Sequence, residues 1–312
     1  MKGAPSSILC LVLCLLMGLD LFTGNGFGPA EGVILWRLRL PRMLTALLAG
    51  ASLALSGLQM QAVFRNPLAD PHIMGVSGGA GLGAAIVALA LGTSPAWFSG
   101  MTLALAAFAG AALTALLIVA LASRLRATTL LILGVMLGFV FSALSSVLQY
   151  SAGEESLKLF YSWMAGSFSG TRPGEMALMA AALAAGTALA VTNRKGLDIV
   201  LFGEDYAALS GAPLRRILRL SMLSASLMTG VVTAFCGPLG FVGIVAPHLA
   251  RRLCRSSAHA KVLPATLLSG ACLAVTADIL ANLWPTPLPA GSTLALIGIP
   301  LIIWYLCHAS EH

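Results

Sequence analysis

Long apolar stretches alternate with short polar connections along almost the whole chain. A membrane-spanning helix needs about 20 consecutive apolar residues, and stretches near that length recur throughout the sequence. The pattern predicts ten spanning helices, in the windows 7–23, 43–63, 73–92, 101–122, 130–150, 174–192, 218–236, 241–253, 262–283 and 290–308. The eighth window is too short to cross without tilt or help from its neighbours. We therefore expect an all-α, polytopic membrane protein with a single transmembrane domain over residues 1–312.

The composition agrees with this pattern. Of the 312 residues, 58% are hydrophobic and only 9% are charged, whereas a soluble domain carries about 25% charged residues. No stretch between the windows is long enough for a separate soluble domain. Any module that converts energy or captures a ligand must therefore be another polypeptide. The first window could instead be a signal peptide, but residues 23–28 contain no small-x-small cleavage site.

The net charge of +7 predicts an orientation in the membrane. The basic residues lie in short loops beside apolar windows, which is typical of the positive-inside bias and not of nucleic-acid binding. With both termini in the cytoplasm, thirteen of the eighteen lysines and arginines are cytoplasmic. Arg37, Arg39 and Arg42 run against this bias, because they cluster on the predicted outer side.

Residues 151–173 form the longest outer connection after the fifth window. The connection contains Glu154 and Glu155, and then an apolar run that ends at Met164 and is too short to cross a membrane. We expect a periplasmic loop with a short re-entrant or surface helix. That helix could gate the mouth of a pathway or could only anchor the chain at the interface.

Residues 193–217 form the largest cytoplasmic insertion, and we expect two short helices there. Glu204 and Asp205 suit the first turn of a helix, Gly211 can close that helix, and Pro213 suits the first turn of the next one. Because the other connections are so short, a docking surface is favoured over a solvated connector.

The segment Arg65-Asn66-Pro67-Leu68-Ala69-Asp70-Pro71 places polar, proline-rich backbone between two apolar windows. Such backbone must be buried in protein or line an aqueous path, because hydrocarbon cannot satisfy its donors and acceptors. Pro67 lacks a backbone donor and biases Asn66 away from helical geometry, so the Asn66 side chain can pair with freed backbone groups. The segment is typical of a gated transport pathway.

Three groups of motifs resemble one family along nearly the whole chain. They are Leu-Arg-Leu-Pro-Arg at 38–42 with Asn-Pro-Leu-Ala-Asp-Pro at 66–71, Gly-Pro-Leu-Gly-Phe-Val-Gly-Ile-Val-Ala-Pro-His at 237–248 with Arg251, and Ala-Asp at 277–278 with Gly298 and Pro300. This combination resembles the FecCD-type permeases, the membrane subunits of ABC importers for ferric siderophores, haem and cobalamin.

The resemblance implies a ten-helix protomer, with the fold of the vitamin B12 importer permease, that forms a homodimer around a central pathway. It places the protein in the bacterial inner membrane. Two cytoplasmic ABC ATPase subunits, which carry the ATP and Mg, would bind on one side. A periplasmic or lipoprotein substrate-binding protein would dock on the other. The permease itself would bind no cofactor and catalyse no reaction.

The resemblance also implies roles for individual residues. Arg39 and Arg42, with the neighbouring Arg37, would dock the binding protein, because a rim of one charge orients an oppositely charged partner. The cytoplasmic gate would comprise Asn66, Leu68 and Thr128. The residues that couple to the ATPase would be Gly203, Glu204, Asp205, Ala207, Leu209, Gly211 and Pro213. The chain departs from the family pattern at Asn282, where an arginine is common, and at Ser210, where a leucine is usual.

Two other function classes fit less well. An ion-coupled secondary transporter needs ionisable groups within the membrane. Asp278 is the main candidate and Asp20 the second, without a lysine or arginine partner in any predicted span. Asp278 could serve substrate or protons, or could bond a neighbouring helix. An enzyme would need a nucleophile with a base, or a metal site. His72 and His248 have no partners at ligand spacing, and the phosphate-binding motif GxxxxGK[ST] is absent.

Overall fold

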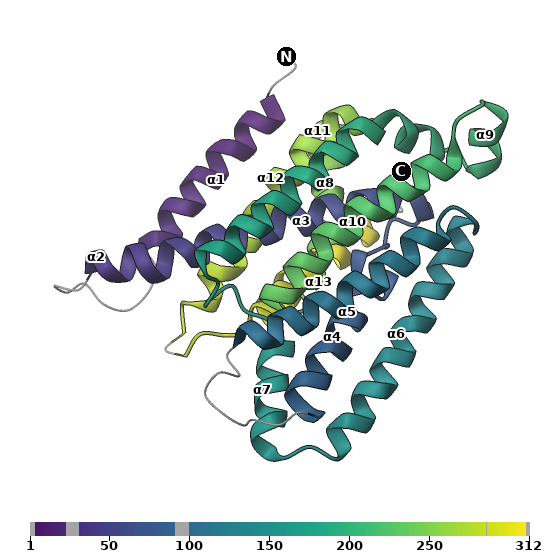
Figure 1. Cartoon of the computed structure of the whole chain (residues 1–312). Helices are drawn as coiled ribbons and strands as arrows, with labels where there is room; N and C mark the ends of the chain where they lie inside the picture. The colour runs from purple at the N-terminus through teal and green to yellow at the C-terminus, as the bar shows by residue number, and fades with distance from the viewer. Residues whose placement is uncertain (1–3, 23–30, 91–99, 285, 310–312) are drawn as a thin grey trace.

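The computed structural model describes residues 4–22, 31–90, 100–284 and 286–309. Residues 23–28, which follow the first apolar window, lie outside the described residues. Most of the described residues are helical and none of them is in a strand. The long helices run side by side in one bundle (Figure 1). The α-helices are α1 (Ala4–Phe22), α2 (Glu31–Ile34), α3 (Leu40–Phe64), α4 (Val76–Ala85), α5 (Gly100–Leu121), α6 (Ala127–Tyr150), α7 (Glu154–Met164), α8 (Pro173–Val200), α9 (Glu204–Leu209), α10 (Leu214–Cys236), α11 (Val242–Cys254), α12 (His259–Ala281) and α13 (Ala290–Ala309).

Short π- and 3₁₀-helical pieces extend this set: η1 (Leu35–Arg39), η2 (Pro71–Met74) and η3 (Ile86–Ala90). Each of the ten predicted windows coincides with a helix. Within the described ranges, seven helices are long and apolar enough to cross a membrane, namely α1, α3 with the turns before it, α5, α6, α8, α10 and α12. The other three windows fall on α4 with η3, on α11 and on α13. Helix α11 has 13 residues, as the short eighth window predicts.

Helix α3 is the core of the bundle. Its apolar window is 83% buried, and it packs against α8, α10, α11 and α12. A Cβ at Gly57 would overlap the backbone of Gly243 in α11, and a Cβ at Gly50 would overlap Gly270 in α12. Small residues let helices approach this closely in a membrane, where apolar side chains gain little from leaving lipid.

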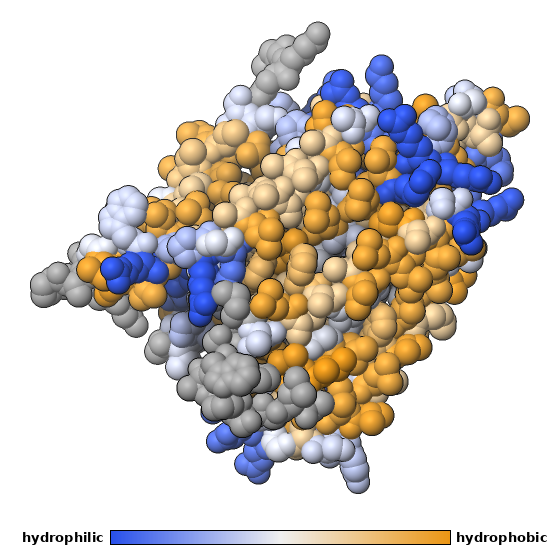
Figure 2. Space-filling model, viewed as in Figure 1, coloured by the Kyte–Doolittle hydropathy of each residue, from blue (hydrophilic) through white to orange (hydrophobic). Residues whose placement is uncertain are grey.

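The outer helices differ from this core. The apolar windows of α1, α6 and α8 are only 11%, 17% and 22% buried, so most of their apolar side chains face outward. Figure 2 shows a hydrophobic zone across one face of the molecule, with hydrophilic residues gathered toward its ends. This distribution matches a bundle whose middle lies in lipid and whose ends meet water.

The connection at 193–217 holds one short helix, α9, and not the two that the sequence predicts. Helix α8 continues to Val200, and α10 begins at Leu214 and runs without a break to Cys236. The predicted second helix is the first part of α10, because no helix-breaking residue separates it from the apolar window that follows. The connection at 151–173 contains α7, whose first turn carries Glu154 and Glu155. In Figure 1, α9 and α7 lie at opposite ends of the bundle.

Candidate functional site

A cavity of about 540 Å³ lies beside α6 and α7. Its lining combines hydroxyl and amide groups with aromatic rings and little charge. The lining residues are Asp70, His72, Ser77, Gly78, Gly81, Gly138, Ser142, Ser145, Gln149, Phe160, Tyr161, Met164, Pro238, Gly240, Phe241 and Ile244. They come from four separate parts of the chain, so the cavity exists only in the folded bundle.

The backbone on one side of the cavity is shaped by the break after α3. The side-chain Oδ1 of Asn66 accepts a hydrogen bond from the backbone N–H of Leu68 at 2.9 Å, which confirms the predicted pairing with freed backbone. Asp70 then caps η2 by accepting a 2.9 Å hydrogen bond from the N–H of His72. The Asn-Pro segment therefore folds as a chain of local caps that leads from α3 into α4.

His72 and His248 each contact a backbone carbonyl through a ring nitrogen. His72 Nε2 lies 2.6 Å from the oxygen of Leu239, and its Nδ1 contacts Ser77 Oγ. His248 Nδ1 lies 2.7 Å from the oxygen of Ile244. His72 thereby ties the η2 turn to the segment before α11, across one wall of the cavity.

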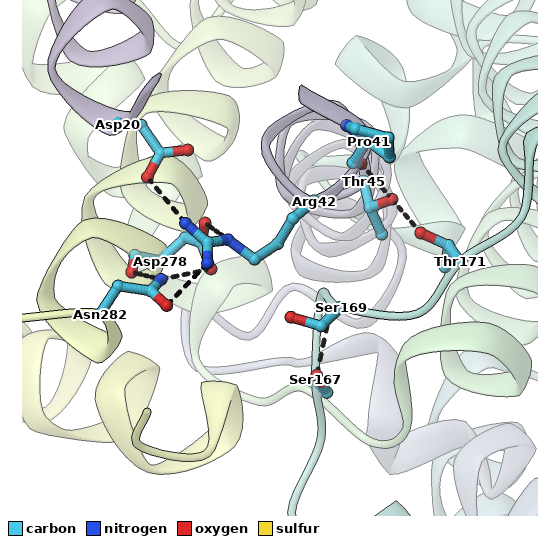
Figure 3. Close-up of polar contacts among 9 residues, drawn as sticks. All are labelled: Asp20, Pro41, Arg42, Thr45, Ser167, Ser169, Thr171, Asp278 and Asn282. Carbon is cyan, nitrogen blue, oxygen red and sulfur yellow. Dashed lines mark hydrogen bonds and ion pairs between the residues drawn. The ribbon is translucent and has the colours of Figure 1, made fainter. Parts of the chain in front are cut away.

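The predicted outer arginines differ in their surroundings. Arg42 donates from Nε to Asp278 Oδ2 at 2.8 Å and from Nη1 to Asn282 Oδ1 at 2.7 Å, and Asp20 Oδ1 lies 3.8 Å from its Nη2. Figure 3 shows the Arg42 side chain extending from α3 toward Asp20 in α1 and toward Asp278 and Asn282 at the end of α12. Arg39 is buried and donates to the oxygen of Leu21 at 2.9 Å. Arg37 is exposed.

These contacts correct one sequence inference. The expectation that Asp278 lacks an arginine partner is wrong. Helix α3 begins at Leu40, before the predicted window, so Arg42 lies on this helix and forms an ion pair with Asp278 in α12. Asn282, which stands where the family commonly has an arginine, accepts a hydrogen bond from Arg42. The docking role of the three arginines stays a prediction, with Arg37 as its exposed member.

A second polar contact lies close to this network. Thr45 in α3 pairs through its hydroxyl with Thr171 and with the oxygen of Pro41, and Ser167 accepts a hydrogen bond from the N–H of Ser169 (Figure 3). The Thr45–Thr171 bond holds the loop between α7 and α8 against the start of α3, and the Ser167–Ser169 bond lies within that loop. No feature of the sequence pattern indicated this contact.

The predicted coupling segment divides into buried and exposed members. Gly203 and Ala207 are buried, and Gly203 and Gly211 have φ angles of +116° and +72° that suit glycine. Pro213 is the N-cap of α10. Leu209 is 89% exposed, and Asp205 is also exposed.

Sequence reasoning missed two aromatic residues in this segment. Phe202 is 74% exposed and Tyr206 is 53% exposed, and their rings lie 5.4 Å apart. The available signal in the sequence was a pair of aromatic residues that flank the charged residues Glu204 and Asp205. With Leu209 they form an exposed apolar surface, which we call the α9 surface (Phe202, Tyr206 and Leu209).

The predicted gate residues lie in two places. Asn66 and Leu68 follow α3, where Leu68 is 41% exposed, and Thr128 is exposed in the first turn of α6. The structure describes no hydrogen bond between these two places. Each lies directly after a residue that contacts the start of α9: Arg65 approaches Gly203, and Ala127 bonds Glu204.

Comparisons with known proteins agree on one family. The model of the FecCD transport family matches residues 9–308. The chain is 38% identical over 309 residues to the vitamin B12 import system permease protein BtuC of Escherichia coli O127:H6, with 97% of this chain and 93% of the relative covered. The protein of the same name from Shigella sonnei gives the same identity and coverage.

Solved structures give the same result for the fold. A structure described as an inward-facing conformation of a metal-chelate type ABC transporter has a TM-score of 0.87 and 28% identity, with 98% of this chain and 99% of that chain covered. PsaBC from Streptococcus pneumoniae in complex with Fab has a TM-score of 0.51 and 19% identity, over 85% of this chain and 90% of that chain, which shows a shared fold alone.

Proposed function

Because this chain belongs to the FecCD transport family, we propose that it is the membrane permease of a binding-protein-dependent ABC importer, and that its cargo is a large metal chelate. The observation that carries this proposal is the near full-length likeness to vitamin B12 import permeases. The cargo is cobalamin in the first instance, with ferric siderophores and haem as the other members of the class.

The cavity supports a cargo of this class. Its volume of about 540 Å³ lies within the range of cavities that hold small molecules and cofactors. Among the described lining residues, Asp70 contributes a carboxyl group and His72 an imidazole, and the rest are hydroxyl, amide, aromatic, apolar or glycine residues. A bulky chelate with little net charge suits these walls, and a second copy of the chain would enlarge the space.

The surface of α6 supports the homodimer that we propose. This helix presents large apolar residues such as Phe139 and Val147 to its surroundings, yet Ser142 and Ser145 on the same helix line the cavity. A polar strip that faced lipid would lose its hydration. A second copy packed along α6 would cover the apolar residues and enclose the polar strip as one wall of a shared pathway.

Partner subunits would occupy the two ends of the bundle. The α9 surface is apolar and lies at an end of the molecule where hydrophilic residues also gather, which suits docking to a cytoplasmic ATPase that binds ATP and Mg. At the other end, the exposed Arg37 would contact a periplasmic or lipoprotein binding protein. Both termini are then cytoplasmic, and the membrane is the bacterial inner membrane.

The structure weakens the case for an ion-coupled secondary transporter. Such a carrier needs ionisable groups in the membrane that can exchange protons or ions during transport. Asp278 is 3% exposed and is bonded to Arg42, so the carboxylate that the sequence offers for this role already has an internal cation. No second candidate function is favoured by a specific contact.

Uptake by reconstituted vesicles tests the proposal. The permease, its ATPase and its binding protein are placed in liposomes with labelled cobalamin, a ferric siderophore or haem outside. We expect uptake of one of these chelates only when ATP is supplied. Uptake driven by a proton or sodium gradient without ATP would overturn the proposal.

A further inference from the structure

Three exposed arginines occupy the first two turns of α10. Arg215, Arg216 and Arg219 are exposed, whereas Ile217 and Leu218 between them are buried. The arginines therefore lie on the face of α10 that no neighbouring helix of the chain covers. The first turn of α10 contains no acidic residue, and the N-terminal end of a helix carries a partial positive charge. Cations at this end repel the helix dipole and one another, so the face favours an external anion.

Helix α8 brings a fourth cation to the same height in the bundle. Asn193 Nδ2 in α8 donates to the oxygen of Ile217 at 3.0 Å and to Ser221 Oγ at 2.9 Å. A Cβ at Gly196 would lie 2.6 Å from the Ile217 side chain, so the two helices touch at this level. Lys195 is exposed and lies between Asn193 and Gly196 in the sequence. It completes a set of four exposed cations, which we call the α8–α10 basic surface (Lys195, Arg215, Arg216 and Arg219).

The carboxyl groups in the connection between α8 and α10 do not neutralise this surface. Oδ1 of Asp198 accepts a 2.9 Å hydrogen bond from the backbone N–H of His259 and lies 2.6 Å from its ring Nδ1. Oε1 of Glu204 accepts a 2.8 Å hydrogen bond from the backbone N–H of Ala127. Within the described parts of the chain, no ion pair joins the α8–α10 basic surface to a carboxylate. Its positive charges therefore remain available to an anion from outside the chain.

An exposed apolar strip continues from the basic surface toward the middle of the bundle. Leu223 follows Arg219 by four residues and is 41% exposed, and Val191 precedes Lys195 by four residues and is 42% exposed. Residues four apart share a helix face and differ in height by about 6 Å. Both helices are long and apolar enough to cross a membrane, and in Figure 2 hydrophilic residues at the end near α9 adjoin the hydrophobic zone. The cations therefore lie where hydrocarbon meets water, at a height from which long basic side chains reach lipid phosphates.

We propose that the α8–α10 basic surface binds an anionic phospholipid of the cytoplasmic leaflet. The phosphate lies among the guanidinium groups, whose paired N–H donors match phosphate geometry, and an acyl chain lies along Leu223 and Val191. A soluble acidic protein fits less well, because the apolar strip continues into the part of the surface that faces hydrocarbon. The inference uses the proposed function only to place this leaflet on the cytoplasmic side, where anionic lipids attract basic segments of membrane proteins.

Lipid binding to the purified permease in detergent tests the inference without any transport measurement. Native mass spectrometry during lipid titration gives the Kd for phosphatidylglycerol and for phosphatidylcholine, whose headgroup has a phosphate but no net charge. We expect the unmodified protein to bind phosphatidylglycerol at least about tenfold more tightly than phosphatidylcholine. At about fivefold in affinity per basic residue beside an anionic lipid, Arg215→Gln with Arg219→Gln should weaken phosphatidylglycerol binding about 25-fold. Phosphatidylcholine binding should not change.

Arg194→Gln with Arg255→Gln is the matched control. Both arginines are exposed at the same end of the molecule, so this variant loses the same charge. Arg194 precedes Asp198 by one helical turn, and Asp198 contacts His259 in α12, so Arg194 lies toward α12 and not on the basic surface. Arg255 follows α11. The control variant should therefore keep the phosphatidylglycerol affinity of the unmodified protein, and added salt should weaken the binding of both.

The possible results decide the inference. Equal affinity of the unmodified protein for the two lipids would overturn it, and this comparison holds even where a variant fails to fold. Unchanged phosphatidylglycerol binding in Arg215→Gln with Arg219→Gln would also overturn it. Glycerol phosphate that binds as tightly as the lipid would make this a site for soluble anions, and loss of ATPase co-purification in the double variant would assign the surface to that partner. None of these results depends on ATP-driven uptake, so the proposed function is tested separately.

Discussion

Arg42→Met should destabilise the protein more than Asp278→Asn, although the two side chains form one ion pair. Arg42 lies between two buried carboxylates, since its Nε bonds Asp278 at 2.8 Å and its Nη2 lies 3.8 Å from Asp20. Asp278 and Asp20 are 3% and 1% exposed. Removal of Arg42 takes the shared cation from both carboxylates. In Asp278→Asn, Arg42 still lies beside Asp20, and the new amide oxygen at position 278 can still accept a hydrogen bond from the Nε of Arg42.

The contacts set the magnitudes. Loss of one partner from a buried ion pair costs about 3–5 kcal/mol, and Arg42→Met should lie at the upper end because two carboxylates are affected. Loss of one charge-assisted hydrogen bond costs about 1.5–3 kcal/mol, which is the range expected for Asp278→Asn. A chain of this size loses about 2 °C in its unfolding midpoint per kcal/mol. The midpoint should therefore fall by about 10 °C in Arg42→Met and by about 3–6 °C in Asp278→Asn.

Thermal unfolding of the detergent-purified protein, followed by tryptophan fluorescence, measures both shifts. Arg37→Met is the matched control, because Arg37 is exposed in η1 and should change the midpoint by less than about 1 °C. The double variant Arg42→Met with Asp278→Asn should be less destabilised than the sum of the single changes, since the pair is lost only once. Additive losses, or an Arg42→Met protein as stable as the unmodified one, would refute the reasoning.

Three further changes test other contacts. Arg37→Glu should weaken binding of the substrate-binding protein about two- to fivefold at low salt and less at high salt, measured by surface plasmon resonance; an effect independent of salt would contradict it. Gly57→Ala should lower the free energy of unfolding by about 1–3 kcal/mol, because the added Cβ would overlap the α11 backbone. Gly18→Ala is the control: a Cβ there meets open space, so the thermal unfolding midpoint should not change. Phe202→Ala with Leu209→Ala should weaken ATPase binding at least about tenfold in a pull-down titration, and equal binding would exclude the α9 surface as the docking site.

The positions of the helices could be predicted from the sequence because lipid imposes a simple rule. Every backbone polar group in the membrane must be satisfied within the protein, so apolar stretches of about 20 residues must be helices. The same rule identified the break at Asn66-Pro67, where the Asn66 side chain bonds the freed N–H of Leu68. The number of helices at 193–217 was predicted wrongly, because hydropathy does not show where a charged turn joins the helix that follows.

The partners of the polar side chains were decided only by the tertiary structure. Arg42 and Asp278 are 236 residues apart, and Glu204 and Ala127 are 77 residues apart, so neither contact has a sequence period that could reveal it. The Arg42–Asp278 contact depends on the close packing of α3 against α12 at Gly50 and Gly270, because that packing sets the distance between the polar groups of the two helices. Hydropathy and motifs determined which segments cross and which family they resemble, whereas the charge partners follow from the three-dimensional packing of those segments.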